Sequence, residues 1–172
     1  MAFGVNSILG DLKRGTARSS HYEMLIAGEE RLAFRTISIS APGRTVASTP
    51  SGVYGAIQEV GYGTIYSPVS AQIYCSPDHW ERKYFTRWQD SIIGRHRTKN
   101  GNTVEADYDV GYYAEYTRSV NIKQYDEAGK ETHEIGLREA YPKSVSDLSY
   151  SYLASELLVF TVTFQYRYFY EK

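Results

Sequence analysis

Hydrophobic and polar residues alternate almost strictly along the last part of the chain, from Leu158 to Tyr170. Leu, Phe, Val and Tyr occupy one set of alternate positions, with Phe169 as an aromatic exception in the other set. That other set comprises Val159, Thr161, Thr163, Gln165 and Arg167. This period of two is typical of a strand that is buried on one side and hydrated on the other. At about 3.3 Å per residue, a single strand of this length would extend roughly 43 Å. Because so long an apolar strand is an aggregation hazard, the pattern predicts a sheet that other copies of the chain complete.

One segment shows helical periodicity instead. Ser76-Pro77-Asp78 offers a hydroxyl N-cap, a proline at the first helical position and a carboxylate near the positive end of the dipole, which predicts a helix over residues 76–93. Its apolar arc holds Trp80, Tyr84, Phe85 and Trp88, and its opposite arc is basic, with Arg82, Lys83 and Arg87. Glu81 interrupts the apolar arc, and we expect it to reach solvent from the first turn. A single amphipathic helix in a β-rich chain is expected to cover one face or end of a sheet.

Strand-forming residues cluster in three segments before that helix. Residues 21–27 and 31–40 are predicted to form two strands joined by a turn at residues 28–30. Residues 64–75 return to a strand-like composition. Residues 41–63 are rich in Pro, Gly, Ser and Thr, which indicates a long loop. Long ordered loops are usually functional, so this one is a candidate binding segment.

An excursion over residues 94–113 follows the helix and is first basic and then acidic. Its charged residues are Arg95, Arg97 and Lys99, followed by Glu105, Asp107 and Asp109. Residues 116–125 and 131–137 are predicted to pair as a hairpin. A turn at residues 141–143 is expected before the final strand.

Length and composition narrow the class of protein. A chain of 172 residues suits one domain, which we place at residues 21–172 after a segment, 1–20, that orders only on assembly. The 17 Tyr are typical of sheets and interfaces, because the ring packs while its hydroxyl stays hydrated. The net charge of -1 creates no general attraction to nucleic acid or to anionic membranes. No apolar run is long enough to cross a membrane, and the N-terminus lacks the apolar core of a signal peptide.

Candidate chemistry is sparse. Cys75 is the single cysteine, so no intrachain disulfide can form and a reducing compartment is expected. Gly61-Tyr62-Gly63 lacks the third glycine and the helix that a dinucleotide site requires. The acidic residues of the excursion lack the glycine and distal glutamate of a calcium loop. Base stacking on tyrosines is disfavoured, because only Arg167 is basic among the tyrosines of the final strand. We therefore predict no enzyme, no cofactor and no metal.

The order of these pieces is more informative than any one of them. It runs from the early strands and the Pro/Gly-rich segment to a helix with Phe85-Thr86-Arg87-Trp88-Gln89, and then to the hairpin strand Ser119–Tyr125. Gly136-Leu137, the segment Tyr141–Leu148 and the alternating strand complete it. From about Ser19 to Tyr170 the chain closely resembles the tail tube proteins of contractile-tailed, T-even-like bacteriophages. The 94–113 excursion and the first twenty residues depart from the family pattern.

This resemblance implies a mainly β subunit, sandwich-like or barrel-like, with one flanking helix. Such subunits form six-membered rings that stack into a hollow tube inside a contractile sheath, and each adds several strands to one ring-wide barrel. Phage DNA passes through the bore without sequence-specific binding. The implied partners are other copies of the chain, the sheath, baseplate and tail-terminator proteins, with assembly in the host cytoplasm and a final place in the virion tail. The family implies no catalytic residues, no cofactor and no membrane.

Candidate site residues follow from this reading. Arg44, Pro50, Tyr54 and Tyr62 mark the 41–63 loop, which is expected to contact the neighbouring ring. Thr161, Thr163, Gln165 and Arg167 are expected to face the bore or the next subunit. Arg82, Lys83 and Arg87 are expected to face an acidic sheath surface, with a plain solvated helix face as the alternative. The basic and acidic halves of the 94–113 excursion are expected to pair between copies.

Two alternatives remain open. The chain could be the tube subunit of a related contractile injection system, through which no DNA passes. It could also be a monomeric β-sandwich module that binds sugars or peptides through exposed tyrosines. The mass in solution distinguishes the second alternative, because a tube protein forms rings or polymers.

Overall fold

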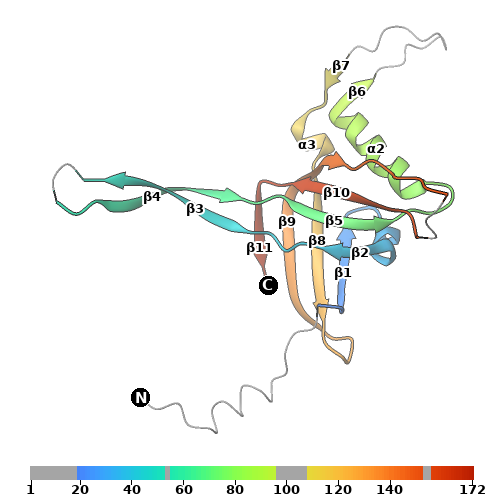
Figure 1. Ribbon diagram of the computed structural model, residues 1–172, viewed down its shortest axis with the longest axis horizontal. Coiled ribbons are helices and arrows are strands. Elements are labelled where there is room, and N and C mark those ends of the chain that lie inside the picture. Colours follow the sequence, from blue (N-terminus) through green and yellow to red (C-terminus); the bar gives the residue numbers. More distant parts are fainter. Residues whose placement is uncertain (1–18, 53–54, 96–107, 153–155) are drawn as a thin grey trace.

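Two antiparallel sheets packed around one core form the body of the protein (Figure 1). The computed structural model describes residues 19–52, 55–95, 108–152 and 156–172. Sheet A contains β1 (Tyr22–Ile26), β8 (Arg118–Tyr125), β9 (Glu131–Val145) and β11 (Tyr168–Glu171). Sheet B contains β2 (Thr36–Ile39), β5 (Val69–Tyr74), β10 (Val159–Gln165) and the last part of β9. The strands of sheet B run across those of sheet A, so the body is an orthogonal sandwich.

The long strand β9 belongs to both sheets. Its first part pairs with β8 and β11, and its last part pairs with β10. The change of sheet occurs near Glu139, which has a positive φ of 53° and forms an ion pair with Arg167 at 3.0 Å. The turn that we predicted at residues 141–143 is wrong, because Pro142 lies within β9. The register shifts beside Pro142, and such an irregularity is where a strand tolerates a residue without an N–H donor.

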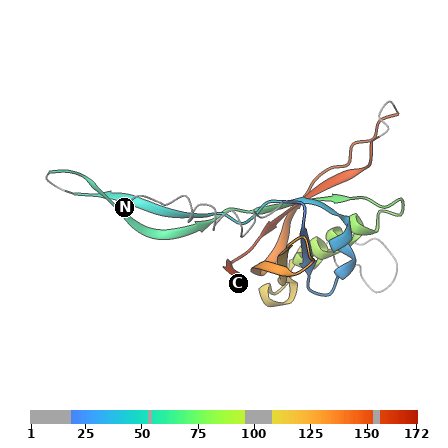
Figure 2. The ribbon, with the colours of Figure 1, turned by 90° about the horizontal axis from the view of Figure 1, so that it is seen from below.

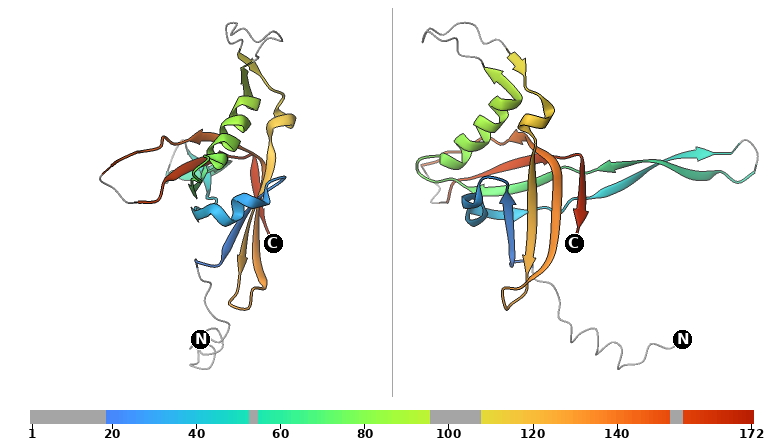
Figure 3. Two further views of the ribbon diagram at one scale, coloured as in Figure 1. Left: turned by 90° about the vertical axis from the view of Figure 1, so that its right-hand side faces the viewer. Right: turned by 180° about the vertical axis from the view of Figure 1, so that it is seen from behind.

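A core of aliphatic and aromatic side chains fills the sandwich, and helix α2 (Trp80–Ile92) covers its upper part (Figure 3). Phe85 of α2 packs against Phe160 and Phe164 of β10, with ring centroids 6.1 and 5.9 Å apart. Trp88 is also buried, and its indole N–H donates to the carbonyl of Tyr116 at 2.6 Å. The mainly β class with one flanking amphipathic helix is therefore confirmed.

The beginning of α2 differs from the prediction. The helix starts at Trp80 rather than at residue 76, after His79 in the left-handed region at φ 54°. Ser76 does not cap the helix as expected. Instead, its backbone N–H donates to the carboxylate of Glu81 at 2.9 Å, and its hydroxyl also donates to that carboxylate. Glu81 is only 1% exposed, so the expectation that it reaches solvent is wrong. These bonds, together with Arg35 at 3.6 Å, satisfy the carboxylate in its buried position.

The final stripe is not one strand but two. It divides at Tyr166 and Arg167, where the chain leaves β10 in sheet B and enters β11 in sheet A. The hydroxyl of Tyr166 donates to the carbonyl of Ser67 at 2.8 Å, and the N–H of Arg167 donates to the carbonyl of Arg138. These contacts hold the corner. Simple alternation did not reveal it, because both strands keep the same period.

The two predicted N-terminal strands do not pair with each other. β1 pairs with β8, whereas β2 pairs with β5. The 3-10 helix η1 (Glu30–Arg35) separates them and buries Leu32 in the core, so the first half of the second predicted strand is helical. The predicted hairpin of residues 116–125 and 131–137 is confirmed as β8 and β9, with β9 extending to Val145.

The segment that we expected to be a loop, residues 41–63, is a long hairpin. β3 (Arg44–Ser51) and β4 (Gln58–Tyr66) pair along their length and project away from the body (Figure 2). We refer to these two strands as the arm. Its Pro and Gly content suggested a loop, but Pro50 and the glycines of β4 are tolerated because both outer edges of this ribbon are free of strands in the described residues.

The 94–113 excursion lies largely outside the described residues. Its described parts include β6 (Ile93–Arg95) and β7 (Tyr108–Val110), which pair antiparallel, followed by the short helix α3 (Tyr113–Tyr116). The predicted pairing between its basic and acidic halves concerns residues outside the described ranges, and it stays a prediction. So does the expectation that residues 1–20 order on assembly.

Candidate assembly interfaces

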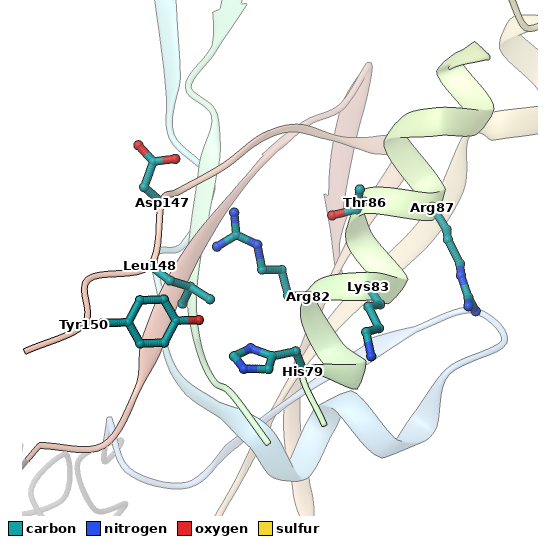
Figure 4. Close-up of a pocket in the computed structure, with 8 residues that line it drawn as sticks. All are labelled: His79, Arg82, Lys83, Thr86, Arg87, Asp147, Leu148 and Tyr150. Carbon is teal, nitrogen blue, oxygen red and sulfur yellow. The ribbon is translucent and has the colours of Figure 1, made fainter. Parts of the chain in front are cut away.

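A basic groove lies along the outer face of α2 (Figure 4). It has a volume of about 690 Å³ and runs between the helix and the segment around residues 147–150. Its cationic walls are Arg82, Lys83 and Arg87, the three residues that we expected to face the sheath, and Leu148 and Tyr150 add apolar surface on the other side. Among the described residues of the lining, Asp147 is the only carboxylate. The arrangement therefore suits an acidic partner that also offers an apolar contact.

Cys75 and His79 lie at the edge of this groove. The thiol Sγ is 3.1 Å from the imidazole Nδ1. Burial raises the pKa of Cys75, and the nearby carboxylate of Glu81 raises it further, so the sulfur stays a protonated thiol at neutral pH. A nucleophilic cysteine requires the opposite shift of its pKa. The pair is therefore a local contact at the end of β5.

No metal site or membrane span stands out in the parts of the chain that the structure describes. There, no three His, Cys, Asp or Glu side chains gather closely enough to hold a metal ion. No helix within the described ranges is long and apolar enough to cross a membrane.

The arm exposes apolar side chains on a two-stranded ribbon. Tyr62 is 73% exposed, and Val46, Val60 and Ile65 also have large exposed fractions. Arg44 and Pro50 are exposed on β3, whereas Tyr54 lies outside the described residues. An isolated hairpin is at best marginally stable in water, and no described element packs behind this one. The ribbon thus has the composition of a surface that another protein covers.

The hydrated face of β10 carries the residues that we expected to face the bore. Thr161, Thr163 and Gln165 are half-buried on the side of sheet B that faces away from the core. Neighbouring hydroxyls and amides continue this face: Ser70 lies 3.5 Å from Thr163, and Ser38 donates to Gln72. Both edges of β10 are paired within the subunit, with β5 and β9. Arg167 lies apart from this face, at the corner where it binds Glu139.

Sheet A presents a different outer face, on which charges are paired. Lys123 binds Glu131 at 2.9 Å, and Lys172 binds Glu134 at 3.2 Å. The hydroxyl of Tyr125 donates to Glu23 at 2.8 Å. The Glu131 carboxylate raises the pKa of Lys123, which keeps this ammonium protonated through neutral pH. The face is therefore rich in charge but nearly neutral in sum.

Tyr170 organises the same face near the C-terminal end. Its ring covers Gly136, where a Cβ would overlap the ring atoms. The guanidinium of Arg138 lies 5.0 Å from the ring centroid on cation–π geometry, and the ammonium of Lys172 lies 5.6 Å from it. Cationic side chains on this face thus already have aromatic or carboxylate neighbours within the subunit.

Within the two sheets of the body, three strands have one edge without a strand partner in the described residues: β1, β2 and β11. β1 and β11 are the two outer strands of sheet A, so this sheet is open on both sides. Sheet B is open at β2, and on its other side the strand β9 links it to sheet A. Open edges of this kind are where a sheet accepts strands from another chain.

A comparison with family models decides which proteins the chain is related to. The model described as phage tail tube protein matches residues 4–172, which is nearly the whole chain. The chain belongs to the phage tail tube protein family. No curated protein sequence matches it.

Solved structures share the fold of this tail tube protein at low sequence identity. A chain of the sheath–tube complex of the PVC extracellular contractile injection system is 11% identical, with a TM-score of 0.62 over 99% of both chains. A chain from the sheath/tube terminator of that system is 12% identical, with a TM-score of 0.67 over 91% of this chain and 96% of the other. A chain from the baseplate of the anti-feeding prophage is 13% identical, with a TM-score of 0.60 over 92% and 97%.

Sequence reasoning missed the paired charges and open edges of sheet A in this tail tube protein. Part of the charge pairing could be seen in the predicted hairpin, where Lys123 stands opposite Glu134 once the two strands are aligned. Lys172 and Tyr170 join them only because β11 returns to β9, and nothing local in the sequence shows this return. By contrast, the basic arc of α2 was visible from its helical period alone.

Proposed function

We propose that this chain is the subunit of the inner tube of a contractile phage tail, which stacks six-membered rings into a conduit for DNA. Membership in the tail tube family supports the tube, and the two open edges of sheet A support the ring. The single observation that carries most weight is that both outer strands of sheet A, β1 and β11, lack a second strand partner in the described residues, and such edges can accept a strand from another copy.

The strand directions of sheet A favour closure into a ring-wide barrel. Each neighbouring pair in the order β1, β8, β9, β11 is antiparallel, so β1 and β11 run in opposite directions. Rotation about a ring axis leaves unchanged the direction in which each strand runs along that axis. The β1 strand of one copy therefore meets the β11 strand of the next in antiparallel orientation, which continues the ladder without interruption.

Such a barrel directs the charged outer face of sheet A toward the bore, because the core and sheet B lie on the other side of sheet A. Free cations in a bore would bind phosphates and slow the passage of DNA. The pairing of Lys123 and Lys172 with carboxylates supports a conduit that DNA crosses without being held. The hydroxyl-rich face of β10, with Thr161, Thr163 and Gln165, is then assigned to contacts between subunits rather than to the bore wall.

The basic groove of α2 is the proposed contact with the sheath. Two of the similar solved structures are assemblies in which a tube meets a sheath or a terminator, and this supports an equivalent outer surface here. Reversing the charge at Arg82, Lys83 and Arg87 should abolish sheath assembly and spare the bare tube. Normal sheath assembly on the charge-reversed variant would show that the groove is not the sheath contact and is instead a solvated helix face.

The arm is the proposed contact with the neighbouring ring. It leaves the body on the β11 side, beyond the edge of sheet A (Figure 1). Strands in closed barrels are typically tilted by 35–45°, so an arm that crosses them runs partly along the ring axis. Deleting residues 51–61 should leave folded subunits or rings that do not elongate. Elongation at the normal rate would exclude the arm from ring stacking.

Negative-stain microscopy of the purified chain tests the proposal as a whole. Hollow cylinders or rings are expected at high protein concentration or on a baseplate. A sample that stays monomeric under both conditions and binds a sugar or a peptide would support the binding-module alternative.

A tube of a contractile injection system without a capsid is the second candidate. Two of the similar solved structures favour it, because they come from an extracellular contractile injection system. Baseplate proteins are the further proposed partners in either case. A capsid gene beside the coding sequence would decide for the phage tail, and its absence would favour the injection system.

A further inference from the structure

The open edges of sheet A carry backbone groups whose direction can be assigned. On β1, the carbonyl of His21 accepts from Tyr125 and the N–H of Ala27 donates to Ser119, both toward β8. Residues alternate along a strand, so Tyr22 and Met24 direct their N–H and C=O groups away from β8. Ile26 faces the same way, but its carbonyl already accepts from the N–H of Glu29 at 2.9 Å. The outward groups of Tyr22 and Met24 therefore form the open edge of β1.

The same reasoning applies to β11. Lys172 and Glu134 exchange backbone hydrogen bonds in both directions, so the even-numbered residues of β11 face β9. Phe169 and Glu171 therefore direct their N–H and C=O groups to the other side. Each open edge thus offers two residues with outward groups, spaced two apart, as an antiparallel partner requires.

We propose that adjacent copies join through one specific register, with Met24 opposite Phe169 of the adjacent copy and Tyr22 opposite Glu171 of the adjacent copy. This junction rests on the proposed function, because it is the contact that closes the ring. It assigns a partner, a second copy of this chain, to both open edges. It also places Glu23 opposite Tyr170 and Leu25 opposite Tyr168 of the adjacent copy.

The side-chain faces agree with this register. Met24 is fully buried in the core, and Phe169 packs against the core through Tyr66 and Tyr166. Glu23 pairs in register with Lys123, and Tyr170 covers Gly136, so both lie on the charged outer face. A slip by one residue would bring Met24 onto the charged face, which the burial of each strand forbids.

A slip by two residues would keep each side chain on its own face of the sheet, but β1 and β11 of the adjacent copy would overlap over fewer residues. In the proposed register all four residues of β11 lie opposite residues of β1. A slip by two in either direction moves part of β11 beyond the end of β1. The proposed register also places the ammonium of Lys172 of the adjacent copy diagonal to the carboxylate of Glu23, so the ion-pair pattern of the outer face continues across the junction.

Cysteine cross-linking tests the register directly. Glu23 and Tyr170 of the adjacent copy form a non-hydrogen-bonded pair, whose Cα atoms lie about 4.5 Å apart in antiparallel sheets, close enough for a disulfide. The variant E23C/Y170C in a Cys75→Ser background should give covalent oligomers up to a closed ring when assembled tubes are oxidised. The matched control E23C/Y168C, which represents the slip by two, should give at least tenfold less product.

The outcomes separate the register from the function. The register would be refuted if E23C/Y170C formed tubes without cross-links, or if E23C/Y168C cross-linked more strongly. Neither result would count against the proposed tube function. Absence of tubes from the unmodified chain would instead count against the proposed function. If E23C/Y170C fails to assemble under reducing conditions, L25C/Y168C tests the same register at the next non-hydrogen-bonded pair. Tubes of L25C/Y168C that do not cross-link would also refute the register.

Discussion

The body and the arm both consist of antiparallel strands, but the strands of the body are partly buried and those of the arm are exposed. In the body, alternate residues of β5 and β10 are fully buried, and Phe160 and Phe164 pack against an aromatic helix face. In the arm, no residue of β3 or β4 is buried, and Tyr62 lies almost free in solvent. The body satisfies its apolar side chains within one chain. The arm does not, so its sequence makes physical sense only in an assembly.

This contrast separates the effects that substitutions should have. A change in the body removes contacts that exist in the single subunit, and it should lower the free energy of unfolding. A change at an exposed position of the arm, such as Val60 or Ile65, removes little intramolecular burial, and it should act on polymerisation. The following variants test the contrast from the largest expected loss of subunit stability to the smallest.

Phe160→Ala should have the largest effect, a loss of about 3–5 kcal/mol in the free energy of unfolding, because it opens a cavity under α2. Chemical denaturation of the unassembled subunit measures it. Phe34→Ala in η1 is the matched control, since Phe34 is 86% exposed and should cost no more than about 0.5 kcal/mol. Equal losses in the two variants would refute the assignment of the core.

Glu81→Gln should cost about 1–3 kcal/mol, because the amide replaces a buried acceptor of the Ser76 N–H and hydroxyl with a group that is half donor. Burial alone raises the pKa of Glu81, but its hydrogen bonds to Ser76 and the charge of Arg35 outweigh burial and lower it below the ordinary value.

The sign of the pH dependence follows from that lowered pKa. Glu81 contributes stability above its unfolded pKa, and this contribution disappears as the pH falls through the lower folded pKa. The stabilities of the wild type and E81Q should therefore converge in acid. A difference between them that stays constant from neutral pH into acid would contradict the role of the carboxylate charge.

Gly136→Ala should cost about 1 kcal/mol, since the new Cβ displaces the ring of Tyr170, which is the movable end of a side chain. Gly63→Ala in the arm is the control, because its Cβ would meet nothing within 4 Å. Thermal unfolding of both variants gives the comparison. A larger loss for Gly63→Ala would mean that the arm is packed in the free subunit.

Val60→Ser combined with Ile65→Ser should change subunit stability by no more than about 0.5 kcal/mol, because both side chains are exposed on the arm. Tube elongation should nevertheless stop or slow strongly, as seen by light scattering and microscopy. Val110→Ser, at an exposed valine of β7, should leave both stability and elongation unchanged. Normal elongation of the double variant would show that these arm residues are not assembly contacts.

Local signals in the sequence predicted those parts of the fold that local physics determines. The apolar arc of α2 and the β8–β9 hairpin were visible because Phe85 with Trp88, and Val120 with Ile122, repeat at the periods of helix and strand. The arm was missed because Pro and Gly are typical of loops and are depleted in strands. A two-stranded ribbon with free outer edges can use residues that a central strand excludes.

Other features depended on contacts between distant residues. Glu81 becomes acceptable in the core only because the chain folds back to bring Ser76 to its carboxylate. The corner at Arg167 exists because Glu139 and Arg138 of β9 lie beside it. The basic arc of the candidate sheath contact could be predicted, but the pair of Glu134 and Lys172 could not, since it forms only when β11 returns to β9.

Amide hydrogen exchange in free subunits and in assembled tubes tests the central claim most directly, that the arm and the open edges of sheet A are completed by other copies. We predict that β5 and β10 are protected in both states, whereas the arm and the outward amides of Met24, Phe169 and Glu171 gain protection only in tubes. Equal exchange of the arm and of these amides in the two states would contradict the account.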